Sequence, residues 1–157
     1  AIMVVQRLSK SMPSFQSEYI EWRTILGWIG KTKFSLFFYE YPLLFDVYEF
    51  SGVKIADVRD IAPMKIAAIA DRGTKRDFVD LYFIIVKKKI LTLEECLALY
   101  DKKFKLLSQN KLHILKSLAY FDDAEAGGEP EMLEPIDWKA VKKFFQRVVV
   151  ALSKKIL

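Results

Sequence analysis

The stretch over residues 60–82, DIAPMKIAAIADRGTKRDFVDLY, constrains the fold of this chain most strongly. Apolar residues recur at helical spacing on both sides of Gly73-Thr74, and a glycine there can take the left-handed conformation that ends a helix. The spacing predicts two short helices joined by a tight turn, the first starting near Ile61 with Asp60 as its N-cap. Helices joined by so short a turn are neighbours.

Charged side chains gather around this turn. Lys65 and Arg72 share one face of the first predicted helix, whereas Asp77 and Asp80 share one face of the second. The short turn is expected to bring the two cations within reach of the aspartate face. Thr74 and Asp77 also have the spacing of a capping box. Two interpretations stay open: the charges pair and lock the turn, or they form a polar site where Lys65 holds a phosphate and an aspartate orients or deprotonates a hydroxyl.

The same stretch carries the pattern D-I-x-x-x-K-x-x-A-x-x-x-R-G-x-x-R-D-x-x-D-L, which resembles the C-terminal signature of the AbiEii/AbiGii toxin family of nucleotidyltransferases. The resemblance extends over roughly residues 33–107. It implies that Lys65 contacts the nucleotide phosphates with help from Arg72, and that Asp80 is the catalytic or hydroxyl-orienting carboxylate, supported by Arg76 and Asp77. The matching residues are Asp60-Ile61, Lys65, Ala68, Arg72-Gly73, Arg76-Asp77 and Asp80-Leu81.

For a complete enzyme, the resemblance implies transfer of a nucleotide from an NTP, with Mg²⁺, to an RNA or protein acceptor, and a cognate antitoxin as partner. The metal carboxylates of the family come from an upstream Gly-Ser or Gly-Gly followed by Asp-x-Asp, and this sequence lacks that motif. We therefore expect a C-terminal part of a longer protein, or a degenerate relative, that binds no metal and is inactive alone. A fragment with half a sheet is also expected to dimerise.

The alternative is a non-catalytic binding or interaction module, so whether this chain is itself an enzyme stays open. In that interpretation the charged residues only lock the fold, and the aromatic-rich first half docks on a partner. The two hypotheses share one expected architecture, an α+β fold in a single domain over residues 1–157. Residues 1–59 would form a partial nucleotidyltransferase-like mixed sheet and residues 60–157 a helical bundle.

The local patterns predict the remaining elements. Residues 1–12 form a helix, residues 18–29 and 33–40 form strands with the second more deeply buried, residues 43–50 form an apolar connection, and residues 53–58 form a strand. Helices follow from Thr92, with Glu95 as its capping-box partner, to about residue 107, over residues 111–120, and from Asp137 to about residue 153. Residues 121–135 form an acidic surface loop.

Composition excludes several classes of protein. A hydrophobic fraction of 52% excludes a disordered chain, and no apolar run approaches the ~20 residues that span a bilayer. The single cysteine, Cys96, excludes an internal disulfide, and we expect a cytoplasmic protein. A net charge of +5 suits binding to phosphates, although the lysine clusters are expected on solvated helix faces. These clusters are Lys87-Lys88-Lys89, Lys102-Lys103-Lys105, Lys142-Lys143 and Lys154-Lys155.

Overall fold

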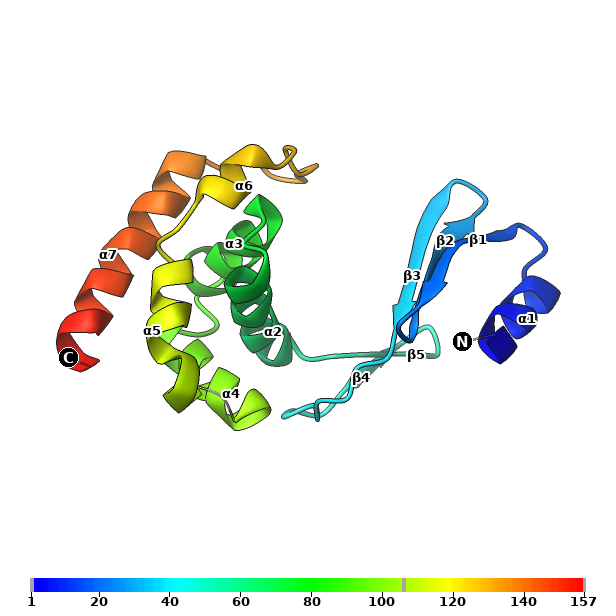
Figure 1. The fold of residues 1–157 in the computed structure, drawn as a ribbon, viewed down its shortest axis with the longest axis horizontal. Helices are drawn as coiled ribbons and strands as arrows, with labels where there is room; N and C mark the ends of the chain where they lie inside the picture. Colours follow the sequence, from blue (N-terminus) through cyan, green and yellow to red (C-terminus); the bar gives the residue numbers. More distant parts are fainter. Residues whose placement is uncertain (1, 106, 157) are drawn as a thin grey trace. The chain divides into compact units, whose positions relative to one another are not determined.

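The computed structural model describes residues 2–105 and 107–156, and Figure 1 shows their fold. Short antiparallel sheets occupy the first part of the chain and helices the second, which confirms the predicted α+β class. The chain divides into two compact units, residues 1–41 and residues 42–157. The charged turn lies within the second unit.

The first unit contains a helix and a three-stranded sheet. Helix α1 (Ile2–Ser11) precedes β1 (Phe15–Glu21), β2 (Thr24–Ile29) and β3 (Thr32–Phe37), which pair antiparallel in that order. The predicted helix is confirmed, but the single strand expected over residues 18–29 is wrong. The chain reverses at Trp22 and Arg23, whose φ angles of 50° and 60° form a hairpin turn of the kind that matches strand twist.

The sheet of the first unit buries little apolar surface. Phe15 and Ile25 are its buried hydrophobic residues, and the Phe15 ring meets Phe34 edge to face with centroids 5.8 Å apart. The deep burial expected for residues 33–40 is wrong, because Phe37 is 54% exposed and β3 ends there. Gly27 is required where β2 meets β1, since a Cβ atom there would lie 2.2 Å from the Gln16 carbonyl oxygen.

The second unit begins with a short hairpin. Strand β4 (Tyr48–Phe50) pairs antiparallel with β5 (Val53–Ile55) across Ser51 and Gly52, which both have positive φ angles. Residues 43–50 are therefore not only a connection, and the strand expected over residues 53–58 is shorter than predicted. In the described residues the strands form two separate antiparallel sheets and not the expected mixed sheet.

Helices pack around α2 to build the core of the second unit. Helix α2 contacts α3, α4 and α5, and α3 contacts α6 and α7. Ile66 of α2, Phe78 of α3 and Phe145 of α7 are fully buried in this core. The elements are α2 (Val58–Asp71), α3 (Lys75–Tyr82), a π-helical turn η1 (Phe83–Lys87), α4 (Leu93–Phe104), α5 (Leu107–Ser117), α6 (Asp122–Ala126) and α7 (Trp138–Ile156).

The predicted helices are present, but several ends differ: α4 ends at Phe104 and not near residue 107, and α5 spans Leu107–Ser117 and not residues 111–120. The capping box of Thr92 and Glu95 at the start of α4 is confirmed, and Asp137 accepts from the Lys139 amide before α7. The surface loop expected over residues 121–135 contains α6, because Phe121 and Ala124 are buried against the core. Helix α2 begins at Val58 and not near Ile61.

Asp60 is not the N-cap of α2. Asp57 takes that position and accepts from the Arg59 amide at 2.8 Å, whereas Asp60 lies buried in the first turn. Its carboxylate accepts from the amides of Leu44 (2.9 Å) and Phe45 (3.0 Å). It also pairs with the Lys103 ammonium at 2.7 Å. Asp60 therefore fastens α4 and the segment before β4 to the start of α2.

The pair of Asp60 and Lys103 is fully buried, with both side chains at 0% exposure. Burial would raise the pKa of Asp60, but the hydrogen bonds from Lys103 and from the amides of Leu44 and Phe45 lower it below the usual value. The ammonium also donates to the Pro42 carbonyl at 2.7 Å. Lys103 thus belongs to the core, and the expectation that it lies on a solvated face is wrong.

We predict that Lys103→Met destabilises the chain by about 3–5 kcal/mol, because it leaves the Asp60 carboxylate charged and buried without its cation. Urea unfolding at neutral pH measures the loss. Lys102→Met is the matched control, since Lys102 is the exposed neighbour on the same helix and its loss should stay within ~0.5 kcal/mol. Equal losses for the two variants would contradict the structural role of Lys103.

Candidate functional site

The charged residues of α2 and α3 meet across the turn between these helices. The Lys65 ammonium lies 3.2 Å from Asp77 Oδ1 and 2.6 Å from Asp80 Oδ2. The Arg72 guanidinium, at the C-cap of α2, places its Nε atom 3.3 Å from Asp77 Oδ2. The prediction that the turn brings these cations to the face of Asp77 and Asp80 is confirmed.

The turn itself forms largely as the sequence predicts. Gly73 has a φ angle of 52°, and its amide donates to the Ala68 carbonyl at 3.1 Å, so it ends α2 in the left-handed conformation. Thr74 is the N-cap residue of α3, but its side chain makes no capping hydrogen bond. Its hydroxyl instead donates to Asp77 Oδ2 at 2.6 Å, because an ionised carboxylate can only accept. The expected capping box is therefore wrong.

The two aspartates of α3 differ in their surroundings. The Asp77 side chain is 2% exposed and the Asp80 side chain is 42% exposed. Burial would raise the pKa of Asp77, but hydrogen bonds from Thr74, Arg72 and Lys65 lower it below the usual value. Asp77 is therefore an ionised carboxylate saturated by protein donors, while Asp80 is accessible from solvent.

A depression beside this turn, which we name the turn pocket, has a volume of about 570 Å³. That volume lies in the range of small-molecule sites. Four cationic side chains line it, and it surrounds the first turn of α3, where the helix dipole also favours anions. The lining residues are Lys65, Arg72, Thr74, Lys75, Arg76, Asp77, Gly127, Gly128, Glu129 and Pro130.

A second depression, the loop groove, adjoins the turn pocket and has a volume of about 310 Å³. Arg76 and Pro130 line both depressions, so the two lie next to each other at these residues. Asp80 lines the loop groove together with apolar side chains. The other lining residues are Val79, Phe83, Glu131, Met132, Leu133 and Glu134.

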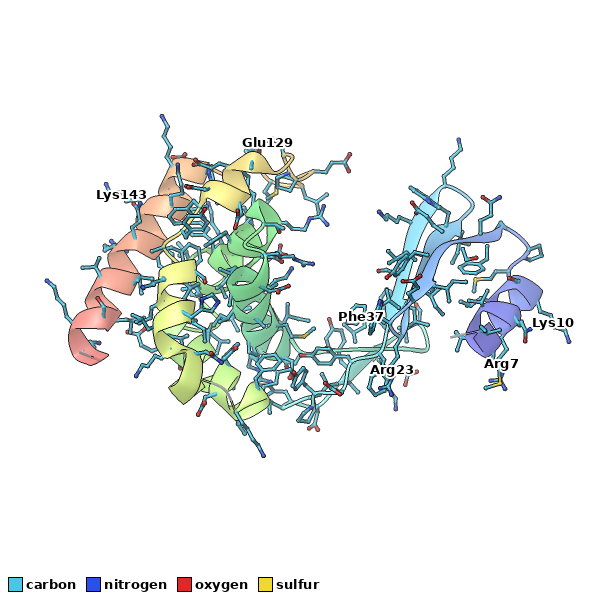
Figure 2. The ribbon with its side chains drawn as sticks, in the orientation of Figure 1. Arg7, Lys10, Arg23, Phe37, Glu129 and Lys143 are labelled. Atoms are coloured by element: carbon cyan, nitrogen blue, oxygen red, sulfur yellow. The ribbon has the colours of Figure 1, made fainter. Side chains whose placement is uncertain are left out.

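The sequence patterns did not assign residues 127–134 to the site. Figure 2 labels Glu129, which lies in the loop that follows α6. The Glu129 carboxylate pairs with the Lys75 ammonium across 54 residues of sequence. No local spacing signals a contact between residues so far apart in the sequence.

The donor set of this site fits phosphate better than metal. Within residues 2–105 and 107–156 no group of three or more His, Cys, Asp or Glu side chains could hold a metal ion.

His113 places Nε2 3.0 Å from the Ala70 carbonyl oxygen, which is a structural contact. Burial raises the pKa of Cys96 to about 12, so its thiol is unreactive. None of the described helices is long and apolar enough to cross a membrane.

Asp77→Asn should destabilise the chain at neutral pH by about 2–4 kcal/mol, because it removes a buried charge that three donors surround. Asp80→Asn should cost less than ~1 kcal/mol, since its carboxylate is exposed. The Asp77 contribution is complete above the unfolded pKa of about 3.9 and disappears as the pH falls through the lower folded value. The difference between wild type and Asp77→Asn should therefore narrow in acid. Urea unfolding from neutral to acid pH measures it, and the opposite order of the two variants would contradict the assignment.

Comparison with known proteins places these residues in a family. The model of the nucleotidyl transferase AbiEii toxin, type IV toxin–antitoxin system, matches residues 33–151, which include every residue of the turn pocket. An uncharacterized protein of Aquifex aeolicus (strain VF5), aq_aa25, is 38% identical over 149 residues, which cover 92% of this chain and 67% of that protein. No solved structure matches the chain. The chain belongs to the AbiEii family of nucleotidyltransferase toxins of type IV toxin–antitoxin systems.

Proposed function

We propose that this chain supplies the phosphate-binding cations and the hydroxyl-orienting carboxylate of a nucleotidyltransferase that moves a nucleotide from an NTP to an RNA or protein acceptor. One observation carries the proposal. The Lys65 ammonium lies between the buried Asp77 and the exposed Asp80, and it lines a pocket with Arg72, Lys75 and Arg76. A cation fixed in this way is positioned before a ligand arrives.

The chemistry of nucleotidyl transfer needs these residue types. The acceptor hydroxyl attacks the α-phosphorus of the NTP, the bond to the leaving pyrophosphate breaks, and the hydroxyl loses its proton. Negative charge is spread over the phosphate oxygens in the transition state, so cations fixed beside them lower the barrier. Lys65, Arg72 and Arg76 supply such cations in the turn pocket.

The aspartates divide the remaining roles. Asp77 Oδ2 already accepts from Thr74 and Arg72, and Oδ1 accepts from Lys65, so Asp77 positions Lys65. Asp80 is accessible, lines the loop groove and contacts Lys65. We assign to Asp80 the hydrogen bond from the acceptor hydroxyl. An ammonium has three donors, so Lys65 can keep both carboxylates and offer one donor to a phosphate oxygen.

Mg²⁺ supplies additional charge neutralisation to nucleotidyl transfer when it is bound. The described residues of the site suit phosphates and include no group that could hold the metal. As a member of a type IV toxin–antitoxin family, the protein is expected to have a cognate antitoxin.

A second candidate function rests on the first unit. Large exposed apolar side chains lie on its sheet and beside the strand ends, among them Trp22 (89% exposed), Phe37 and Phe38. Surfaces of this kind are typical of protein interaction sites. In this alternative the first unit binds a protein partner or a second copy of the chain, and the charges of α2 and α3 only lock the turn. Self-association measured by light scattering would support this role.

We predict that Lys65→Met weakens binding of nucleoside triphosphates to the chain at least about tenfold, because the phosphates lose a directly bound cation. Isothermal titration calorimetry with ATP, GTP, CTP and UTP measures the affinity, and circular dichroism checks the fold. Lys116→Met is the control, since Lys116 is an exposed lysine of α5. An unchanged affinity in Lys65→Met would contradict the phosphate role. Absence of binding by the wild-type chain would favour the interaction module.

A further inference from the structure

Lys75 is a fourth cation of the turn pocket, and the family pattern in the sequence does not include it. It is the first residue of α3, and its side chain is 10% exposed, whereas that of Arg72 is 62% exposed. The ammonium lies 5.3 Å from the centroid of the Trp138 ring. An ammonium with so little access to water needs an anionic partner.

The partner of Lys75 is Glu129, whose side chain is 80% exposed. Glu129, which Figure 2 labels, belongs to the stretch 127–130, Gly-Gly-Glu-Pro. This stretch lines the turn pocket. An exposed carboxylate gains little from an ion pair, because water and salt compete for it. The cation therefore sits in a wall of the pocket, and its anion can leave into solvent.

The other ion pairs of the pocket are built differently. Lys65 and Arg72 share the buried carboxylate of Asp77, which three donors hold in place. Lys75 faces a carboxylate from a glycine-containing loop distant in sequence. A polyphosphate carries several negative charges and can contact Lys75 together with Lys65 and Arg72, so it competes favourably with one glutamate.

We propose that Lys75 is an additional polyphosphate-binding residue and that Glu129 occupies its ammonium until a triphosphate chain replaces the carboxylate. This inference rests on the proposed function, since it assigns the triphosphate to the turn pocket. Glu129 then acts as a competitor within the site. A ligand with a single phosphate gains too little from the pocket to replace Glu129, so the pair selects triphosphates over monophosphates.

A purely structural role predicts the opposite behaviour. If the pair only fastened residues 127–130 to α3, loss of the Glu129 charge would loosen a wall of the pocket and weaken binding. The sign of the change in affinity therefore separates the two roles.

The test measures binding of inorganic tripolyphosphate and of orthophosphate to the chain by isothermal titration calorimetry. Glu129→Gln should bind tripolyphosphate about fivefold more tightly, the factor that corresponds to one exposed ion pair. In Glu129→Gln, the preference for tripolyphosphate over orthophosphate should shrink. Lys75→Gln should weaken tripolyphosphate binding about tenfold. Glu131→Gln is the control, because it removes the same charge from an exposed residue that lines the loop groove but not the turn pocket.

Equal or weaker binding in Glu129→Gln, or an equal gain in Glu131→Gln, would overturn the proposal. If this occurred while Lys65→Met lost affinity, the phosphate role of Lys65 would stand and only the role of the Lys75–Glu129 pair would fail. If Glu129→Gln gained affinity and Lys65→Met lost none, the role of the Lys75–Glu129 pair would stand and the phosphate role of Lys65 would fail. Absence of tripolyphosphate binding in every variant would overturn both.

Discussion

The site depends on the hydrogen bonds that the buried carboxylate of Asp77 accepts. It accepts hydrogen bonds from Thr74 in the turn, from Arg72 at the end of α2 and from Lys65 on the same face of that helix. These contacts fix the α2–α3 turn and at the same time place the Lys65 ammonium. Asp60 has the same task at the other end of α2, where it holds α4 and residues 44–45. Ionised carboxylates therefore anchor both ends of the helix that carries Lys65.

The family signature thus combines two kinds of residue. Three residues have structural roles: Asp60, Gly73 and Asp77. The two aspartates are buried carboxylates with hydrogen-bond donors from the protein, and the glycine has a positive φ angle. Lys65 and Asp80 retain access to solvent at the edge of the turn pocket and the loop groove. The first three residues lock the fold, and we propose ligand binding for Lys65 and Asp80, so the two interpretations concern different members of the same pattern. A rigid support is what a site for precise phosphate positioning requires.

The sequence predicted the contacts around the charged turn, where they are local, and failed to predict the contacts between segments distant in the sequence. Helical spacing and Gly73 were sufficient to predict that Lys65 and Asp77 meet, because both lie on short helices joined by one turn. The partners of Asp60 could not be predicted, since Lys103 looks like any lysine of a basic cluster until α4 packs on α2. The hairpin at Trp22 escaped detection because non-glycine residues there take positive φ angles. The contact of Glu129 with Lys75 was missed for the same reason, since it also joins segments that are distant in the sequence.

The most direct test of this account is to locate the bound triphosphate on the chain. Proton–nitrogen correlation spectra recorded during titration with a nucleoside triphosphate report which backbone amides respond. If the turn pocket holds the triphosphate, shifts concentrate at residues 65, 72–77 and 127–130, which line this pocket. Shifts that instead follow the exposed lysines at 87–89 and Lys143 would contradict this account, because they would show attraction to general positive charge and no phosphate site between α2 and α3.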